Sequence, residues 1–196
     1  MSQNNSGRTI EQLKEYLEAH GVKYLIPSYV DMHGVPKTKM VPMAHFERML
    51  TGSELFTGAA LDGVPQDVSD EEVGAVPDPD SCIWIPWRDD AAWFSSDLWC
   101  EGKPFAPCNR GILKKVLAQA GDMGFTVNCG IEAEFYVFKD DEDRTTPISP
   151  LPHLEKPAYD AVRLMDNLDF WLSDLVDAMN YLEWDVYSFD HEDGIG

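Results

Sequence analysis

Apolar residues recur along this chain with two different periods, which predicts a fold that mixes helices with strands. Over residues 10–20 they return at helical spacing, directly after a capping-box pattern that begins at Thr9, so we predict a helix there. Residues 23–31 and 35–41 are rich in β-branched and aromatic side chains. The short turn between them contains Gly34, so the two runs are predicted to form a β-hairpin.

The pattern continues with a short helix and two further strand-like runs. A proline and a glycine bracket the helix, which we expect at residues 43–50. An acidic, proline-rich loop then leads to residues 82–87 and 91–99, whose aromatic and apolar content predicts strands. This order of elements predicts a small α+β domain over residues 1–104.

A turn-rich stretch near residue 105 predicts a domain boundary, and the second domain covers residues 105–196. We expect Asn109 to cap its first helix. The expected elements are a helix at 110–124, a strand at 126–138, a helix at 169–182 and a strand at 184–190. A strand followed by a glycine-containing loop typically leads into another element, so we interpret the chain as part of a longer protein.

Charge and cysteine content narrow the classes of function. The formal net charge is −20, from 35 acidic and 15 basic residues, which disfavours binding to nucleic acid or to an anionic membrane surface. The four cysteines lack zinc-like spacing and the first residues lack an apolar signal segment, so we expect a cytoplasmic protein with reduced thiols. No apolar run approaches the roughly 18 residues of a membrane-spanning helix.

Two glutamates at alternate positions of a predicted strand are the first candidates for chemistry. Glu132 and Glu134 would share one face of the strand at 126–138, about 6–7 Å apart at Cα, where they could hold neighbouring hard cations. Such pairs also occur on solvated strand faces, but this strand is otherwise apolar, where unpaired charge is costly. The acidic run 190–193 either adds oxygen and imidazole ligands or forms a solvated loop.

Other catalytic motifs are absent from the sequence. It contains no phosphate-binding glycine loop, no nucleophile elbow and no zinc-protease helix motif. We interpret the remaining histidines as surface or packing residues, namely His20, His33, His45 and His153. Carboxylates are therefore the main candidates for function.

Four segments of the chain resemble the glutamine synthetase family. The segment GIEAEFYVF, residues 130–138, resembles the glutamate-containing strand of the family's active site, and SFDHEDGIG, residues 188–196, resembles its later histidine–glutamate strand. YVDMHGVPKTKMVP, residues 29–42, is similar to a hairpin of the amino-terminal domain, and FTGAALDG, residues 56–63, to a loop that reaches a neighbouring subunit. The resemblance implies an α+β protein: a β-grasp amino-terminal domain followed by the beginning of a catalytic α/β domain with antiparallel strands.

The same resemblance implies roles for four carboxylates. Glu134 and Glu192 match ligands of the metal on the glutamate side, and Glu132 matches a ligand of the metal that bridges the nucleotide phosphates. Asp62 matches the aspartate that receives the ammonium ion and serves the active site of an adjacent subunit, which implies a homo-oligomer. The implied cofactors are two Mg²⁺ or Mn²⁺ ions per complete site, with ATP as co-substrate.

The implied reaction is ATP-dependent formation of an amide between the glutamate side chain and an amine, through a γ-glutamyl phosphate. Tyr187 stands where many members carry a nucleotide-contacting glutamate, and the loop after Asp62 contains no tryptophan. The amine therefore stays open between ammonia, methylamine and a polyamine. Because family members are much longer, we expect these residues by themselves to lack ligase activity. The alternative is a non-catalytic relative that binds other subunits through its β-grasp domain.

Overall fold

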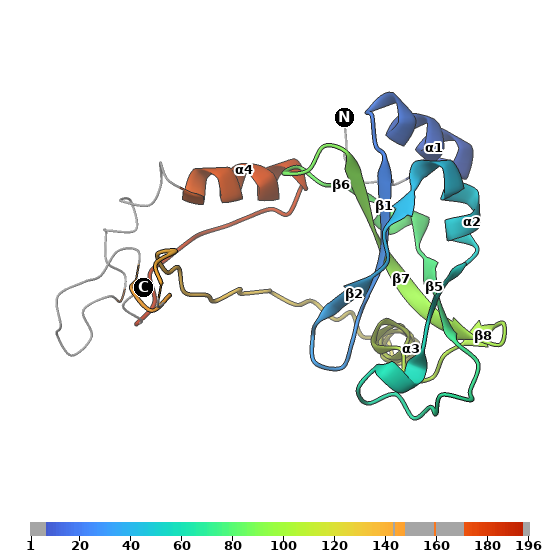
Figure 1. Cartoon of the computed structure of the whole chain (residues 1–196). Helices are drawn as coiled ribbons and strands as arrows, with labels where there is room; N and C mark the ends of the chain where they lie inside the picture. The colour runs from blue at the N-terminus through green and yellow to red at the C-terminus, as the bar shows by residue number, and fades with distance from the viewer. Residues whose placement is uncertain (1–6, 143, 148–158, 160–170, 194–196) are drawn as a thin grey trace. The chain divides into compact units, whose positions relative to one another are not determined.

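A mixed sheet organises the first of the two units into which the chain divides, residues 1–128 and 129–196. The computed structural model describes residues 7–142, 144–147, 159 and 171–193. The sheet has the strand order β2-β1-β7-β5-β4, to which β3, β6 and β8 add as short neighbours (Figure 1). The strands are β1 (Tyr24–Val30), β2 (Pro36–Thr38), β3 (Val41–Pro42), β4 (Glu54–Phe56), β5 (Val73–Pro77), β6 (Ile83–Trp84), β7 (Ala91–Cys100) and β8 (Lys103–Pro104).

Strand pairing in this sheet combines one parallel pair with antiparallel neighbours. β1 and β7 run parallel, with Tyr24 opposite Ala91, whereas the other pairs are antiparallel. Ser28 of β1 lies opposite Thr38 of β2, so the predicted hairpin is confirmed. The α+β class expected for this part of the chain is also confirmed.

Two helices on the sheet form as the sequence pattern predicts. Helix α1 (Ile10–Ala19) begins at a capping box, in which Thr9 Oγ1 accepts from the Gln12 N–H at 3.3 Å and Gln12 Oε1 accepts from the Thr9 N–H at 2.9 Å. The second predicted helix forms as the 3₁₀ turn η1 (Met43–His45) followed by α2 (Phe46–Leu50).

The core of this unit consists of two apolar clusters. In the larger cluster, side chains of α1 and α2 such as Leu17 and Phe46 pack on β1 and β7, where Leu25 and Phe94 are fully buried. The smaller cluster joins β5 to β7 and to the start of the next helix through Val73, Ala75, Leu98 and Cys108, with Tyr29 of β1. Accordingly, Figure 1 shows α1 and α2 near one end of the sheet and α3 near the other.

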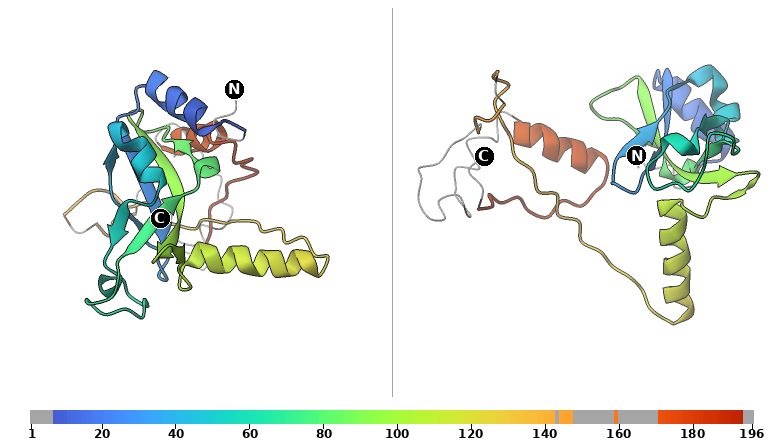
Figure 2. Two further views of the ribbon diagram at one scale, coloured as in Figure 1. Left: turned by 90° about the vertical axis from the view of Figure 1, so that its right-hand side faces the viewer. Right: turned by 60° about the horizontal axis from the view of Figure 1, so that its bottom comes forward.

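Helix α3 (Asn109–Asp122) starts differently from the sequence prediction. The thiol of Cys108, instead of Asn109, caps it by accepting from the Gly111 N–H at 3.4 Å. Asn109 is engaged elsewhere, because its Nδ2 donates to the carbonyls of Val30 (3.1 Å) and Asp31 (2.6 Å). From this attachment α3 extends away from the sheet (Figure 2).

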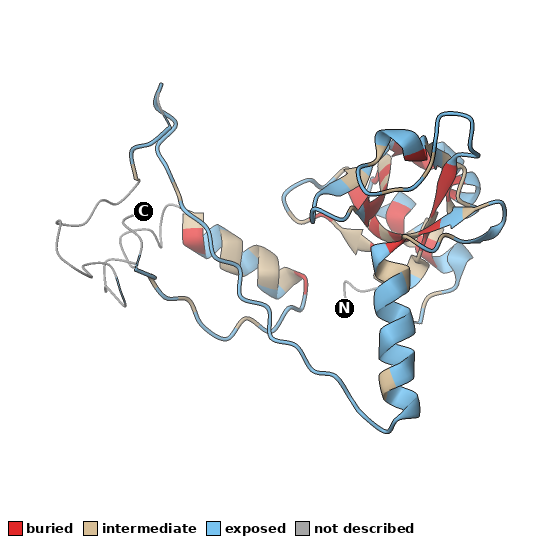
Figure 3. Ribbon diagram, turned by 90° about the horizontal axis from the view of Figure 1, so that it is seen from below, coloured by how far each residue is buried: buried red, intermediate tan, exposed pale blue. Residues whose placement is uncertain are grey.

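The unit formed by residues 129–196 contains helix α4 (Ser173–Tyr181), within the helix predicted for 169–182. The structure differs from the prediction at 126–138 and 184–190, since neither segment forms a strand. A strand needs a hydrogen-bonded neighbour, and in the described part of this unit the β pairing is one isolated bridge, Phe138 with Pro147. Most residues of the two segments 126–138 and 184–190 are exposed (Figure 3).

The predicted domain boundary near residue 105 stays a prediction, although the chain divides into two compact units after Asn128. All four cysteines are free thiols: Cys82, Cys100, Cys108 and Cys129. Within the described ranges, no helix is both long and apolar enough to cross a membrane.

Candidate functional site

A tight turn between β1 and β2 holds a histidine in a defined position at the surface. Asp31 Oδ1 accepts hydrogen bonds from the backbone N–H groups of His33 (2.9 Å) and Val35 (3.0 Å), and Gly34 adopts the left-handed region with φ of +78°. Lys37 Nζ lies 3.4 Å from Asp31 Oδ2. These donors, the Val35 N–H above all, hold the pKa of Asp31 below its usual value. The charged carboxylate therefore fixes the turn.

Asp62 lies in the loop after the 3₁₀ turn η2 (Gly58–Ala60), and its carboxylate meets this histidine. His33 Nε2 donates to Asp62 Oδ2 at 2.6 Å. This hydrogen bond is the main cause that lowers the pKa of Asp62, and the backbone of Gly63 adds a smaller contribution. Because 80% of the Asp62 side chain is exposed, the ionised carboxylate remains accessible to a cation from solution.

A small pocket lies between the end of β1, the Asp62 loop and the start of α3. Its lining includes Tyr29, Asp31, Asp62 and Asn109. Tyr29 is 5% exposed, and its hydroxyl has no hydrogen-bond partner in the described part of the chain. Burial, together with the charge of Asp31, raises the pKa of Tyr29 to about 12. The hydroxyl is thus a protonated donor whose hydrogen-bonding capacity is unused.

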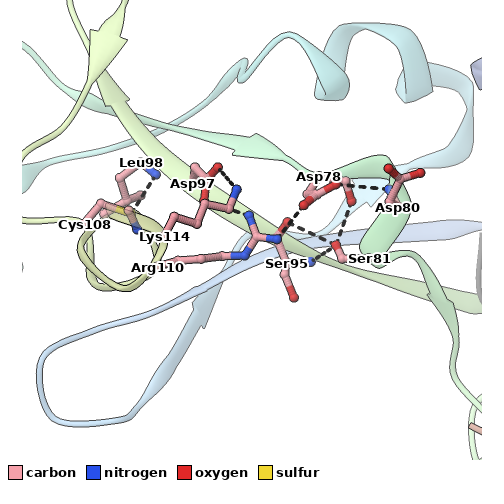
Figure 4. Close-up of polar contacts among 10 residues, drawn as sticks. Asp78, Asp80, Ser81, Ser95, Asp97, Leu98, Cys108, Arg110 and Lys114 are labelled. Atoms are coloured by element: carbon pink, nitrogen blue, oxygen red, sulfur yellow. Dashed lines mark hydrogen bonds and ion pairs between the residues drawn. The ribbon is translucent and has the colours of Figure 1, made fainter. Parts of the chain in front are cut away.

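A cluster of charged side chains attaches α3 to the sheet, as Figure 4 shows. Arg110 lies between Asp97 of β7 and Asp78, which follows β5, and its Nη1 donates to Asp97 Oδ1 at 2.8 Å. Lys114, one turn further along α3, donates to Asp97 Oδ2 at 2.6 Å. Partial burial by itself would raise the pKa of Asp97, but the hydrogen bonds from Lys114 and Arg110 prevail and lower it. This cluster is structural, since both carboxylates are already paired.

The three glutamates predicted as metal ligands lie in the other unit, outside regular secondary structure. Glu132, Glu134 and Glu192 are exposed. Carboxylate oxygens suit Mg²⁺ or Mn²⁺. However, among the residues with described positions, no three His, Cys, Asp or Glu side chains gather closely enough to hold a metal ion. The donor chemistry therefore fits a divalent cation but the observed arrangement does not, and the three-glutamate site stays a prediction.

Sequence reasoning identified Asp62 but missed the groups around it. His33 was interpreted as a surface or packing residue, and 54% of its side chain is indeed exposed, but its pairing with Asp62 was not foreseen. Tyr29 and Asn109 were also missed. No local pattern in the sequence predicts these contacts, because they join residues that lie far apart along the chain. His20, by contrast, packs on the rings of Tyr16 and Trp84, as predicted.

Comparison with known families gives one match that covers the second part of the chain. Residues 106–196 match the family described as "Glutamine synthetase, catalytic domain". The chain is 32% identical to the glutamine synthetase of Rhizobium meliloti and 32% identical to the glutamate–methylamine ligase of Methyloversatilis universalis. Each alignment covers 94% of this chain, and respectively 41% and 42% of the relative.

Solved structures give a consistent result. A chain from a complex of GmaS with ADP superimposes with a TM-score of 0.77 at 28% identity, over 94% of this chain and 42% of the other. Glutamine synthetase of Plasmodium falciparum has a TM-score of 0.71 at 14% identity, over 100% of this chain and 44% of the other, which bears on the fold. The described fold is thus similar to that of both kinds of protein.

Proposed function

Because the chain belongs to the glutamine synthetase family, we propose that the protein is an ATP-dependent ligase that joins the side-chain carboxylate of glutamate to ammonia or another amine. The reaction would pass through a γ-glutamyl phosphate. The supporting observation is that 94% of the chain aligns, at 32% identity, with both a glutamine synthetase and a glutamate–methylamine ligase. The chain spans about two fifths of the length of these relatives, and the activity is proposed for the whole protein.

In this proposal Asp62 binds the cationic form of the amine and then accepts its proton. An exposed carboxylate whose pKa is lowered is ionised at neutral pH and attracts ammonium or an alkylammonium ion. Such a carboxylate is a weak base towards the free cation. Because an ammonium ion has no lone pair, one proton passes to Asp62 first, and the small amount of neutral amine so formed is consumed as its nitrogen attacks the acyl carbon. Phosphate then leaves and takes up the second N–H proton. We further propose that Asp62 serves an adjacent subunit of a homo-oligomer.

We also propose that Glu132, Glu134 and Glu192 are ligands of divalent cations in the whole protein. Mg²⁺ or Mn²⁺ bound there would neutralise phosphate charge. The support is the donor chemistry of three carboxylates, together with the family match over residues 106–196, which includes all three. Since these carboxylates are not gathered in the described arrangement, no step of the reaction is assigned to a metal.

The activity test uses the full product of the reading frame that contains these residues. We expect phosphate release that requires glutamate, ATP and an amine together, and comparison of ammonia, methylamine and a polyamine identifies the acceptor. Asp62→Asn should lower kcat/KM for the amine by about 100-fold or more, whereas Asp67→Asn, an exposed position in the same loop, should not. An absence of glutamate-dependent phosphate release would favour the non-catalytic alternative.

The metal proposal can be tested with the 196-residue chain by calorimetric titration with Mn²⁺. Binding on the order of millimolar is expected, because an incomplete set of carboxylates coordinates weakly. Glu134→Gln and Glu192→Gln should weaken binding, whereas Glu15→Gln, on the exposed face of α1, should leave it unchanged. If all four proteins bind Mn²⁺ equally, the acidic surface at large is the binder and the assignment of these ligands is wrong. The chain itself should show no ligase activity.

A further inference from the structure

The loop that carries Asp62 and the turn that carries His33 touch at two neighbouring positions. One contact is polar, the hydrogen bond of 2.6 Å between His33 Nε2 and Asp62 Oδ2. The other is apolar: Gly63 lies so close to Met32 that an added Cβ would stand 1.7 Å from the Met32 sulfur. Consecutive residues of the loop thus meet consecutive residues of the turn.

We propose that His33 is a positioning residue that orients the Asp62 carboxylate for the reaction. This inference rests on the function proposed above, in which Asp62 receives the amine. His33 itself does not touch the substrate. It acts through Asp62 by holding the Oδ2 oxygen, while 80% of the Asp62 side chain stays exposed to a cation.

The turn is rigid enough to serve as a support for this contact. The Asp31 carboxylate accepts from the backbone N–H of His33 itself and from that of Val35, and Lys37 lies beside it. Asn109 of α3 donates to the Asp31 carbonyl at 2.6 Å. His33 is therefore fixed at its backbone by a turn that is anchored to both the sheet and a helix, and precise positioning of a reacting group depends on such support.

The backbone around Asp62 is held by the Leu61 N–H, which donates to the Gly58 carbonyl at 2.9 Å, and by the Val64 N–H, which donates to the Leu61 carbonyl at 3.2 Å, but the Asp62 side chain projects into solvent. Asp62 is exposed and Gly63 has a φ of +74°, in the left-handed region, where glycine is favoured. A carboxylate on such a loop samples several rotamers unless a partner selects one, and that sampling reduces the fraction of molecules ready to react. The hydrogen bond from His33 supplies that selection.

The charges near Asp62 act in opposite directions. His33 lowers the pKa of Asp62 by hydrogen bonding and by charge, whereas the nearby carboxylate of Asp31 raises it. Lys37 neutralises part of that opposing charge because it pairs with Asp31. Removal of the His33 ring should thus raise the pKa of Asp62 and leave its side chain free to rotate.

The first experiment measures this effect on the 196-residue chain, without reference to activity. The carboxyl carbon of Asp62 is followed by NMR against pH in the wild type, His33→Phe and His33→Gln. We expect a higher titration midpoint in His33→Phe, partial recovery in His33→Gln because its amide still donates, and amide hydrogen exchange of Gly63 at least about tenfold faster in His33→Phe. His45→Gln, another exposed histidine, is the matched control. Equal midpoints in all four proteins would overturn the proposal.

The second experiment uses the full protein and its amine-dependent rate. His33→Phe should lower kcat/KM for the amine by about tenfold, leave KM for glutamate unchanged and move the acidic limb of the pH–rate profile upward, with partial rescue in His33→Gln. A structural role of His33 would not move the pH profile. If Asp62→Asn lowers the rate but His33→Phe does not, the positioning role is wrong. If neither change alters the rate, the role proposed for Asp62 falls, and the positioning role falls with it.

Discussion

Two strand-like segments, one in each half of the chain, have similar apolar patterns but differ in how they are packed. In the first unit, residues 91–100 form β7, which pairs with β1 on one side and β5 on the other and buries Phe94 completely. Residues 126–138, most of which belong to the second unit, carry a comparable apolar pattern but form no strand, and Ile131 is 92% exposed. An apolar alternating pattern therefore yields a strand where neighbouring strands satisfy its backbone, and the pattern by itself is not sufficient.

Two truncations of apolar side chains test this comparison, and the first of them should have the largest effect on stability. Phe94→Ala should destabilise the first unit by about 3–5 kcal/mol, because it removes a fully buried ring from the larger cluster. Ile131→Ala should change stability by less than about 0.5 kcal/mol, since its side chain is already in water. Urea unfolding followed by tryptophan fluorescence measures both. Similar losses for the two variants would mean that Ile131 is packed in solution, which would break the comparison.

A second change asks whether close packing extends from the core to the Asp62 loop. Gly63→Ala should cost about 1–2 kcal/mol, because its φ of +74° disfavours a Cβ and Met32 must also move. Gly102→Ala is the matched control, with a φ of +71° and no atom within 4 Å of the added Cβ. The difference between the two unfolding free energies reports the Met32 contact, and equal costs would show that the contact is absent in solution.

A third change concerns the charged attachment of α3. Asp97 has a lowered pKa in the folded state, so its contribution is present above the unfolded value of about 4 and is lost as pH falls through the folded value. Asp97→Asn should therefore destabilise by about 1 kcal/mol at pH 7 and by much less at pH 3. Urea unfolding at both pH values measures this. A loss of the same size at pH 3 would exclude the ion pairs with Arg110 and Lys114 as its cause.

The smallest expected effect concerns the buried hydroxyl of Tyr29. Tyr29→Phe removes a polar group that has no partner in the described part of the chain, so stability should stay equal or rise by about 1 kcal/mol or less. Thermal unfolding measures the change. A clear loss of stability would show that the hydroxyl has a partner in solution, such as a molecule bound in the small pocket beside Asp62.

Local signals in the sequence were sufficient for several elements. The capping box at Thr9 set the start of α1, and the glycine turn at Gly34 together with its β-rich flanks predicted the hairpin. Strand β5 was missed, because its short run contains glycine and proline and was interpreted as loop. It nevertheless lies inside the sheet, and Gly74 is required there because a Cβ would stand 2.9 Å from the Gly52 carbonyl oxygen. Such a close approach between distant segments leaves no periodic pattern to detect.

The candidate site likewise depends on contacts between distant segments, which local sequence patterns do not predict. Asp62 was found because its surroundings in sequence resemble a family motif, whereas its partner His33 lies 29 residues away on another turn. Glu132 and Glu134 were proposed from their spacing on a predicted strand, and Glu192 from the resemblance to a family motif. Their gathering depends on strand pairing, which local spacing does not determine, and the described arrangement does not bring them together.

The parallel pairing of β1 with β7 has a consequence for synthesis of the chain on the ribosome. Tyr24 pairs with Ala91, which is synthesised 67 residues later. β1 therefore lacks its neighbour β7 until most of the first unit has been made. Contacts of such long sequence separation slow folding, and meanwhile β1 exposes an apolar edge that can pair wrongly. The antiparallel hairpin of β1 with β2 forms from nearby residues and can occupy one edge of β1 during this interval. The order of translation therefore favours hairpin formation first and closure of the sheet last.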